Sequence, residues 1–304
     1  MKVIDRILHP DNMRLAWEEV AARKGSAGID GVSIKRWRRN WEERLINLAA
    51  AVRANTYRPQ PVERFTIPKR DGSLRHLTNL TVTDKVLQRA ALRVLDDLFE
   101  RRFLDCSYGY RQGRGVRDAV QAILHWRDAG FQWVLDADID ECFDSLDHSL
   151  ILAFVREEVD DPIVLRLIGQ WLRMGQQEPE SEKGIPMGAV ISPLLCNLYL
   201  HRLDAALTTR GYAMVRYADD FCVFCGTRSM ARRAWRDTEI VLTDIRLQLE
   251  PNKTAITHFN RGFDFLGVHF HRDTYTFIAA GKQVQVKGKF DHTLFYDYLP
   301  EGYT

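Results

Sequence analysis

The sequence predicts an α+β protein, and three observations support this fold class. Apolar residues recur at helical spacing in several segments, of which residues 37–52 are one, and this spacing predicts amphipathic helices packed on a core. Two pairs of short apolar, β-prone runs, each pair separated by a turn signal, predict hairpins at residues 65–77 and 214–224. The length of 304 residues is enough for a substantial core and for two or three subdomains.

Charge is distributed unevenly along the chain. Residues 1–130 hold 25 Lys and Arg against 16 Asp and Glu, although the net charge of the whole chain is only +2. A basic first half is suited to polyphosphate or nucleic-acid backbone, and an acidic second half is suited to divalent metal. Scattered, solvated charges are the alternative interpretation.

Cysteine usage and hydropathy indicate a non-secreted protein. The five cysteines are odd in number and dispersed, which argues against a disulfide framework and indicates a reducing cytosol. Cys222 and Cys225 form a CxxC pair, but no second pair accompanies it, so a zinc site is disfavoured. No run of about 18 apolar residues is present, so we expect a cytoplasmic protein that does not enter a membrane.

Two adjacent carboxylates mark the tip of the predicted hairpin at residues 214–224. Asp is disfavoured within strands and costly to bury unpaired, so Asp219 and Asp220 indicate a turn, a cation site, or both. The run at residues 133–139 predicts a strand that carries Asp136 and Asp138 into an acid-rich turn. A carboxylate placed beside the hairpin tip would complete a two-metal site for phosphoryl transfer.

The other hairpin carries two cations beside its predicted Asp-Gly turn. Lys69 and Arg75 flank this turn and are suited to clamping triphosphate oxygens, although solvated surface charges are the alternative. The next helix is expected to be capped at Thr83-Asp84. Residues 107–115 form a loop rich in Gly, Tyr and Arg, and residues 263–270 are expected to form one strand interrupted at Gly267.

Seven short motifs then occur in an order typical of one protein family. They are Gly28-Ile-Asp-Gly31, Ile67-Pro-Lys69, Tyr108-Gly-Tyr-Arg111, Asp138-Ile139 with Phe143, Gly184-Ile-Pro186 with Ser192-Pro193, Tyr217-Ala-Asp-Asp220 and Phe265-Leu-Gly267. The chain resembles the reverse transcriptases of the group II intron type, to about residue 278. The resemblance implies a right-hand polymerase fold with fingers and palm.

The resemblance also implies a division of the chain into three parts. Residues 1–130 would form an N-terminal extension and the fingers, and residues 131–278 would form the palm with its catalytic hairpin. Residues 279–304 would be a tail, either a linker or the start of a fused or partner domain. A basic helical thumb is not expected among these residues, because the tail is aromatic-rich and has no helical period.

The same resemblance assigns roles to individual residues. Asp138, Asp219 and Asp220 would be catalytic and would bind two Mg²⁺ ions, for which Mn²⁺ would substitute, with the Ile139 carbonyl as a further ligand. The nucleotide-binding residues would be Lys69, Arg75, Ile139, Phe143, Pro186, Met187, Gly188 and Lys253. Arg111, Leu266 and Gly267 would contact primer or template, and Asp136 and Asp140 would be bystanders.

Three of these assignments have specific consequences. Phe143 would be a steric gate whose ring excludes a ribose 2′-hydroxyl. Lys253 would be a general acid for pyrophosphate, with a solvated turn lysine as the alternative. Met187 replaces the Gln that is usual in the family, so selection of template or nucleotide is expected to differ there.

The implied activity is RNA-directed DNA polymerisation from a DNA or RNA primer on an RNA template with dNTPs. The amino-acid sequences of residues 87–95 and 133–140 are more similar to the CRISPR-associated branch of the family than to the intron maturases. This resemblance implies spacer acquisition from RNA with a spacer integrase as partner. The alternatives are an intron-encoded or other domesticated reverse transcriptase, a catalytically weak nucleic-acid-binding scaffold in an integration complex, and a template-independent terminal transferase.

Overall fold

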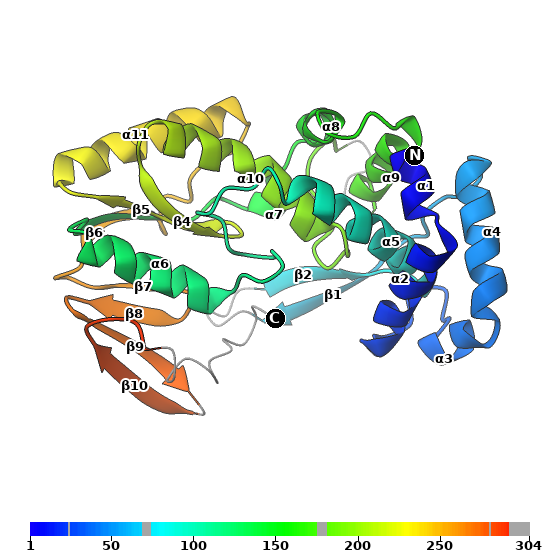
Figure 1. Ribbon diagram of the computed structural model, residues 1–304, viewed down its shortest axis with the longest axis horizontal. Helices are drawn as coiled ribbons and strands as arrows, with labels where there is room; N and C mark the ends of the chain where they lie inside the picture. Colours follow the sequence, from blue (N-terminus) through cyan, green and yellow to red (C-terminus); the bar gives the residue numbers. More distant parts are fainter. Residues whose placement is uncertain (24, 69–73, 175–180, 280, 292–304) are drawn as a thin grey trace. The chain divides into compact units, whose positions relative to one another are not determined.

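The computed structural model describes residues 1–23, 25–68, 74–174, 181–279 and 281–291 (Figure 1). The chain divides into two compact units, each built from two separate stretches. The first unit contains Met1–Arg102 and Cys142–Tyr199, and the second contains Phe103–Glu141 and Leu200–Thr304. The assignment of fingers, palm and tail to particular residue ranges remains a prediction.

The first unit is helical with one two-stranded sheet. Its elements are α1 (Val3–Ile7), α2 (Pro10–Ala22), α3 (Ile34–Trp37), a 3-10 turn (Arg38–Asn40), α4 (Trp41–Arg53), β1 (Glu63–Pro68), β2 (Leu74–Asn79), α5 (Val82–Phe99), α7 (Cys142–Ser145), α8 (His148–Arg156), α9 (Pro162–Leu172) and the first part of α10 (Ser192–Thr209). α5 packs against α1 and α2, and β1 pairs with β2 in antiparallel register, as the hairpin prediction requires.

The start of α5 differs from the prediction. Thr81, not Thr83, caps this helix, because the Thr81 side chain accepts a hydrogen bond from the Asp84 backbone amide at 3.2 Å. The carboxylate of Asp84 is buried and accepts a hydrogen bond from the Tyr57 hydroxyl at 2.6 Å. The Asp84 carboxylate therefore lies in the core, and Thr81, three residues earlier, caps the helix.

The second unit contains two four-stranded antiparallel sheets. The first has the order β4 (Ala213–Tyr217), β5 (Asp220–Cys225), β3 (Trp133–Ala137) and β6 (Ala255–His258). The second runs β10 (Lys282–Lys287), β9 (Thr274–Ala279), β8 (Val268–His271) and β7 (Phe263–Phe265). Helix α11 (Arg228–Asp244) packs on β3 and β5, and α6 (Val116–Asp128) packs on β4 (Figure 1).

Residues 263–270 form a hairpin, so the expected single interrupted strand is wrong. β7 and β8 are antiparallel and are joined by Leu266 and Gly267, whose φ angles are 53° and 77°. Two successive residues with positive φ are the pattern of a type I′ turn, which suits the twist of paired strands. The glycine therefore reverses the chain at this point.

The core of the second unit joins both of its sheets. It includes Val120 and Ile123 from α6, Phe224 from β5, and Phe270 and Tyr275 from β8 and β9. In the part of the chain that the structure describes, no helix is long and apolar enough to cross a bilayer.

Candidate active site

Three carboxylates lie at one end of the β4-β5-β3-β6 sheet. Asp138 directly follows β3, and the last residue of β3, Ala137, pairs with Phe221 of β5. Because the strands are antiparallel, Asp220, which precedes Phe221, lies at the same end as Asp138. Tyr217 pairs with Asp220, which leaves Ala218 and Asp219 as a two-residue turn at that end.

This end of the sheet concentrates negative charge. The pKa of Asp220 is raised to about 7, first by burial and then by repulsion from Asp219, Asp138 and Asp136. The pKa of Asp136 is likewise raised to about 7, chiefly by burial, although the Cys222 thiol at 3.8 Å acts in the opposite direction. The site thus favours a bound proton or another cation.

Lys253 supplies one cation to these carboxylates. Its ammonium nitrogen lies 2.7 Å from Oδ2 of Asp138, and this hydrogen bond raises the pKa of the lysine. The backbone amide of Glu250 donates to the Asp138 carbonyl at 2.9 Å, and the amide of Asp140 donates to the Gln248 carbonyl at 3.0 Å. The turn that carries Lys253 is therefore fixed beside Asp138.

The donor set matches a hard divalent cation in chemical type. Carboxylate oxygens are the ligands that Mg²⁺ prefers, and the repulsion that raises the pKa of Asp220 is the charge that such an ion would neutralise. Across the described ranges, no three or more His, Cys, Asp or Glu side chains converge closely enough to form a ready-made metal site. The residues fit the ion by charge and donor type.

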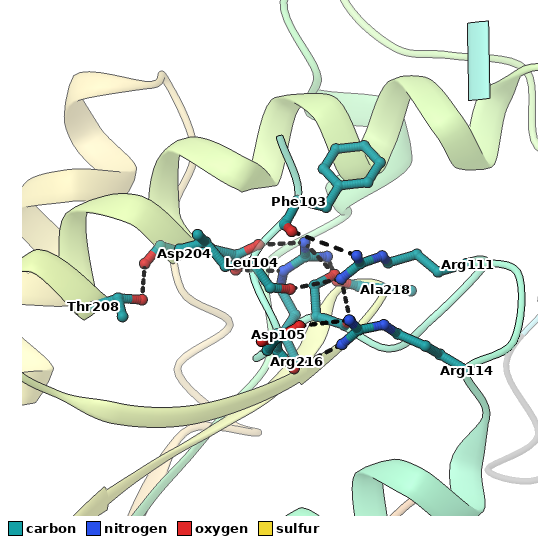
Figure 2. A network of polar contacts seen from close by, with 10 residues as sticks. Phe103, Leu104, Asp105, Arg111, Arg114, Asp204, Thr208, Arg216 and Ala218 are labelled. Atoms are coloured by element: carbon teal, nitrogen blue, oxygen red, sulfur yellow. Dashed lines mark hydrogen bonds and ion pairs between the residues drawn. The ribbon is translucent and has the colours of Figure 1, made fainter. Parts of the chain in front are cut away.

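A buried ion pair supports the turn between β4 and β5 (Figure 2). The Arg216 guanidinium contacts both carboxylate oxygens of Asp204, with Nε to Oδ1 at 2.7 Å and Nη2 to Oδ2 at 2.6 Å. Its Nη1 donates to the Ala218 carbonyl at 2.8 Å, and its Nη2 donates to the Ser107 hydroxyl at 2.8 Å. Neither residue of this pair was predicted from the sequence to have a role.

A signal for the pair is nevertheless present in the sequence. Asp204 is the only acidic residue of α10, a helix that is otherwise largely apolar, and Arg216 is the only charged residue of β4. Burying either charge alone would be costly, so a lone acid and a lone base in neighbouring apolar elements indicate a mutual contact.

The loop of residues 107–115 packs beneath the same turn. Gly109 approaches so closely that a Cβ at this position would lie 2.5 Å from the Ala218 amide nitrogen. Arg111 is 6% exposed, and its Nη1 donates to the carbonyls of Leu104 at 2.6 Å and Ser107 at 2.7 Å. The observed contacts of Arg111 are internal, and its contact with primer or template remains a prediction.

In the first unit, a second loop gathers several of the predicted nucleotide-binding residues. The Met187 carbonyl accepts hydrogen bonds from the Thr78 amide at 2.8 Å and from the Thr78 hydroxyl at 2.9 Å. The Ile185 amide donates to the Phe143 carbonyl at 2.7 Å. Gly188 has a φ of 100°, and a Cβ there would lie 2.7 Å from the Thr78 carbonyl oxygen, so this position requires glycine.

The remaining predicted residues occupy varied settings. Arg75 lies on β2 opposite Ile67 and is exposed, whereas Lys69 lies outside the described residues. Leu266 and Gly267 form the β7–β8 turn, with the Leu266 side chain only 4% exposed.

The remaining predicted pocket residue, Pro186, is buried, and its carbonyl accepts a hydrogen bond from the Ser192 hydroxyl at 2.8 Å. Ile139 pairs with Leu249 in an isolated bridge. Their contacts with substrate remain predictions.

The sequence profile of the family described as "Reverse transcriptase (RNA-dependent DNA polymerase)" matches residues 67–270. "Protein YkfC" of Escherichia coli is 28% identical, with 88% of this chain and 82% of that protein covered. "Group II intron-encoded protein LtrA" of Lactococcus lactis is 32% identical, with 65% of this chain covered and only 34% of that protein.

A solved structure shares the fold. The apo telomerase of Candida tropicalis, truncated from its C-terminal domain, superposes with a TM-score of 0.54 at 12% sequence identity. The match covers 70% of this chain and 54% of the telomerase chain. The mixed α+β architecture expected from the sequence is therefore confirmed as one that occurs in polymerases with fingers and palm.

Proposed function

The chain belongs to the reverse transcriptase family and is an RNA-directed DNA polymerase by that membership, and we propose that Asp138, Asp219 and Asp220 carry its reaction. The proposed reaction is extension of a DNA or RNA primer 3′-hydroxyl with dNTPs on an RNA template. The observation that supports this most directly is the position of the three carboxylates at one end of adjacent strands.

The family uses divalent metal ions, and we propose Mg²⁺ here, with Mn²⁺ as a substitute. When bound, two such ions would activate the primer hydroxyl and stabilise the pyrophosphate leaving group. Asp138, Asp219 and Asp220 would hold them, together with the Ile139 carbonyl. Lys253 neutralises Asp138 in the absence of metal and would serve the departing pyrophosphate once it leaves that carboxylate.

Residues of the first unit are proposed to select the nucleotide. Phe143 would exclude the ribose 2′-hydroxyl, while Pro186, Met187 and Gly188 would line the nucleotide and template pocket. The support for this role is local: the Met187 and Phe143 backbones are tied into one hydrogen-bonded loop with Thr78. Lys69 and Arg75 are proposed to bind the triphosphate.

Primer extension on a defined RNA template tests the proposed function. The wild-type chain is expected to add dNTPs, and Asp219→Ala or Asp138→Asn is expected to abolish the product. Asp273→Ala, which removes an exposed carboxylate paired with Lys287, is the matched control and is expected to keep wild-type activity. Product that persists in Asp219→Ala would contradict the assignment.

The same assay separates two alternative functions. A nucleic-acid-binding scaffold would bind primer–template without extending it, under any metal condition. A terminal transferase would extend the primer equally well when the template is omitted. Template-dependent product that requires Asp219 excludes both.

The finer role is a separate proposal. We infer a part in CRISPR spacer acquisition from RNA, with a spacer integrase as partner, in the prokaryotic cytoplasm. It is supported by the similarity of the amino-acid sequences of residues 87–95 and 133–140 to the CRISPR-associated branch. The similarity to LtrA favours the alternative, an intron-encoded or other domesticated enzyme. A spacer-integrase gene that adjoins or continues this reading frame would support the first role, and an intron RNA bound by the purified chain would support the second.

A further inference from the structure

Arg216 is fully buried beside the turn that carries the proposed catalytic carboxylates. Its side chain and that of Asp204 are both 0% exposed. Two parallel hydrogen bonds between a guanidinium and a carboxylate fix the plane as well as the position of the guanidinium. Asp204 therefore orients Arg216 so that its Nη1 points at the Ala218 carbonyl (Figure 2).

The orientation of the Ala218 carbonyl affects the position of Asp219 in the β4–β5 turn. This carbonyl belongs to the peptide bond that joins Ala218 to Asp219, and a peptide bond is planar. A hydrogen bond to this oxygen therefore sets the orientation of the backbone from which the Asp219 side chain departs. Ala218 also has a φ of 59°, a conformation that residues with a Cβ adopt only when their surroundings hold them in it.

The backbone of Arg216 is anchored to a distant segment as well. Its amide donates to the Cys106 carbonyl at 2.7 Å, and its carbonyl accepts from the Tyr108 amide at 2.8 Å. The side chain reaches Ser107 in the same segment. One residue thus joins α10, the loop before Gly109 and the catalytic turn.

We propose that Arg216, oriented by Asp204, is a positioning residue for Asp219 and Asp220, and this inference rests on the proposed function of those carboxylates. Arg216 touches neither substrate nor metal in this role. It holds the turn in the conformation in which the two carboxylates face Asp138. Without Arg216, kcat and the affinity of the protein for metal would fall, while its affinity for primer–template would stay unchanged.

Arg216→Lys provides the first test, because lysine keeps the charge but cannot reach Asp204, Ser107 and Ala218 together. We expect kcat for single-nucleotide extension to fall about 100-fold, as for a small misplacement of catalytic groups. The half-saturating Mg²⁺ concentration should rise about tenfold, as for loss of a group that orients metal ligands. The Kd for primer–template should be unchanged.

A second variant separates positioning from stability. In the double variant Arg216→Met with Asp204→Leu, an apolar pair replaces the buried ion pair, an exchange that folded proteins often tolerate. We expect a cooperative thermal transition near that of the wild type, together with the same loss of kcat. The control is Arg127→Met, which removes another buried arginine, one that donates to the Gly288 carbonyl at 2.8 Å, and it should leave kcat and the Mg²⁺ dependence unchanged.

Binding of Mn²⁺, followed by electron paramagnetic resonance of the free ion, gives a readout without catalysis. We expect the Mn²⁺ Kd to rise about tenfold in Arg216→Lys and to stay unchanged in Arg127→Met. Wild-type kcat and wild-type Mn²⁺ affinity in the folded Arg216 variants would overturn the inference. A wild-type chain that extends no primer would instead overturn the proposed function, and the Mn²⁺ measurement would still decide the role of Arg216.

Discussion

The ammonium group of Lys253 lies 2.7 Å from a carboxylate oxygen of Asp138, the residue that directly follows the central strand β3. This contact neutralises one of the proposed metal ligands. The Asp138 side chain is only 13% exposed, but the lysine side chain is 59% exposed, so solvent screens the pair and its contribution is on the order of 1 kcal/mol. Lys253 therefore binds the Asp138 carboxylate only weakly, so a divalent ion can displace it.

Replacing Lys253 should consequently strengthen metal binding while it slows the reaction. We expect Lys253→Gln to lower the Mn²⁺ Kd about two- to fivefold, within the small energy of an exposed pair. The chemical step should slow, because glutamine cannot supply a proton to the departing pyrophosphate. Calorimetric titration and single-turnover extension measure the two effects. Lys287→Gln, which breaks the exposed pair with Asp273, is the control. An unchanged Mn²⁺ Kd in Lys253→Gln would refute the competition.

Gly109 should not tolerate a methyl group. A Cβ would lie 2.5 Å from the Ala218 amide nitrogen, so Gly109→Ala must push the β4–β5 turn or its own loop aside. We expect a loss of about 1–3 kcal/mol in the free energy of unfolding, with a marked loss of extension activity. Gly226→Ala is the control, since a Cβ at Gly226 meets nothing within 4 Å. Denaturant titration and primer extension report both quantities, and equal behaviour of the two variants would refute the close packing.

Phe143→Ala should admit ribonucleotides if the ring excludes the 2′-hydroxyl. The side chain is 9% exposed, so its truncation also costs about 3–5 kcal/mol of stability. Phe143→Val removes less packing and serves as the second variant. The ratio of kcat/KM for dNTP and rNTP in single-nucleotide extension measures the effect, and an unchanged ratio in both folded variants would rule out a steric gate.

His148 should contribute stability to the folded protein that is lost under mildly acidic conditions. Burial lowers the pKa of His148 below the ordinary value of 6.5, although the hydrogen bond between its Nε2 and the Gly184 carbonyl, at 2.6 Å, acts in the opposite direction. The unfolded chain therefore takes up this proton at a higher pH than the folded chain. The contribution of His148 to stability is complete above pH 6.5 and is lost as the pH falls below it, whereas the raised pKa values of Asp136 and Asp220 act in the opposite direction over the same range.

Denaturant titrations of the wild type and of His148→Gln at pH 7.5 and pH 5.0 isolate the contribution of His148. His148→Gln retains a donor for Gly184 but does not titrate, so we expect acidification to destabilise this variant less than it destabilises the wild type. His9→Gln changes an exposed histidine and should respond to acidification as the wild type does. A His148 variant with the full wild-type response would show that other groups cause it.

The sequence predicted the carboxylates and their strands because these signals are local. An Asp-Asp pair between β-prone runs and an acid directly after a strand can both be recognised within a few residues. It did not predict the role of Arg216 and Asp204, because that role depends on a contact between strand β4 and helix α10. The reversal at Leu266 and Gly267 was missed for a related reason, since a leucine with positive φ is held by burial of its side chain in the core.

The buried pair also has a bearing on the order in which the second unit assembles. Asp204 and Arg216 are separated by 12 residues, whereas Arg216 and Ser107 are separated by 109. Closing a short loop costs less chain entropy than closing a long one. We therefore expect helix α10 and the β4–β5 hairpin to form a local folding nucleus, onto which the segment around Ser107 docks afterwards.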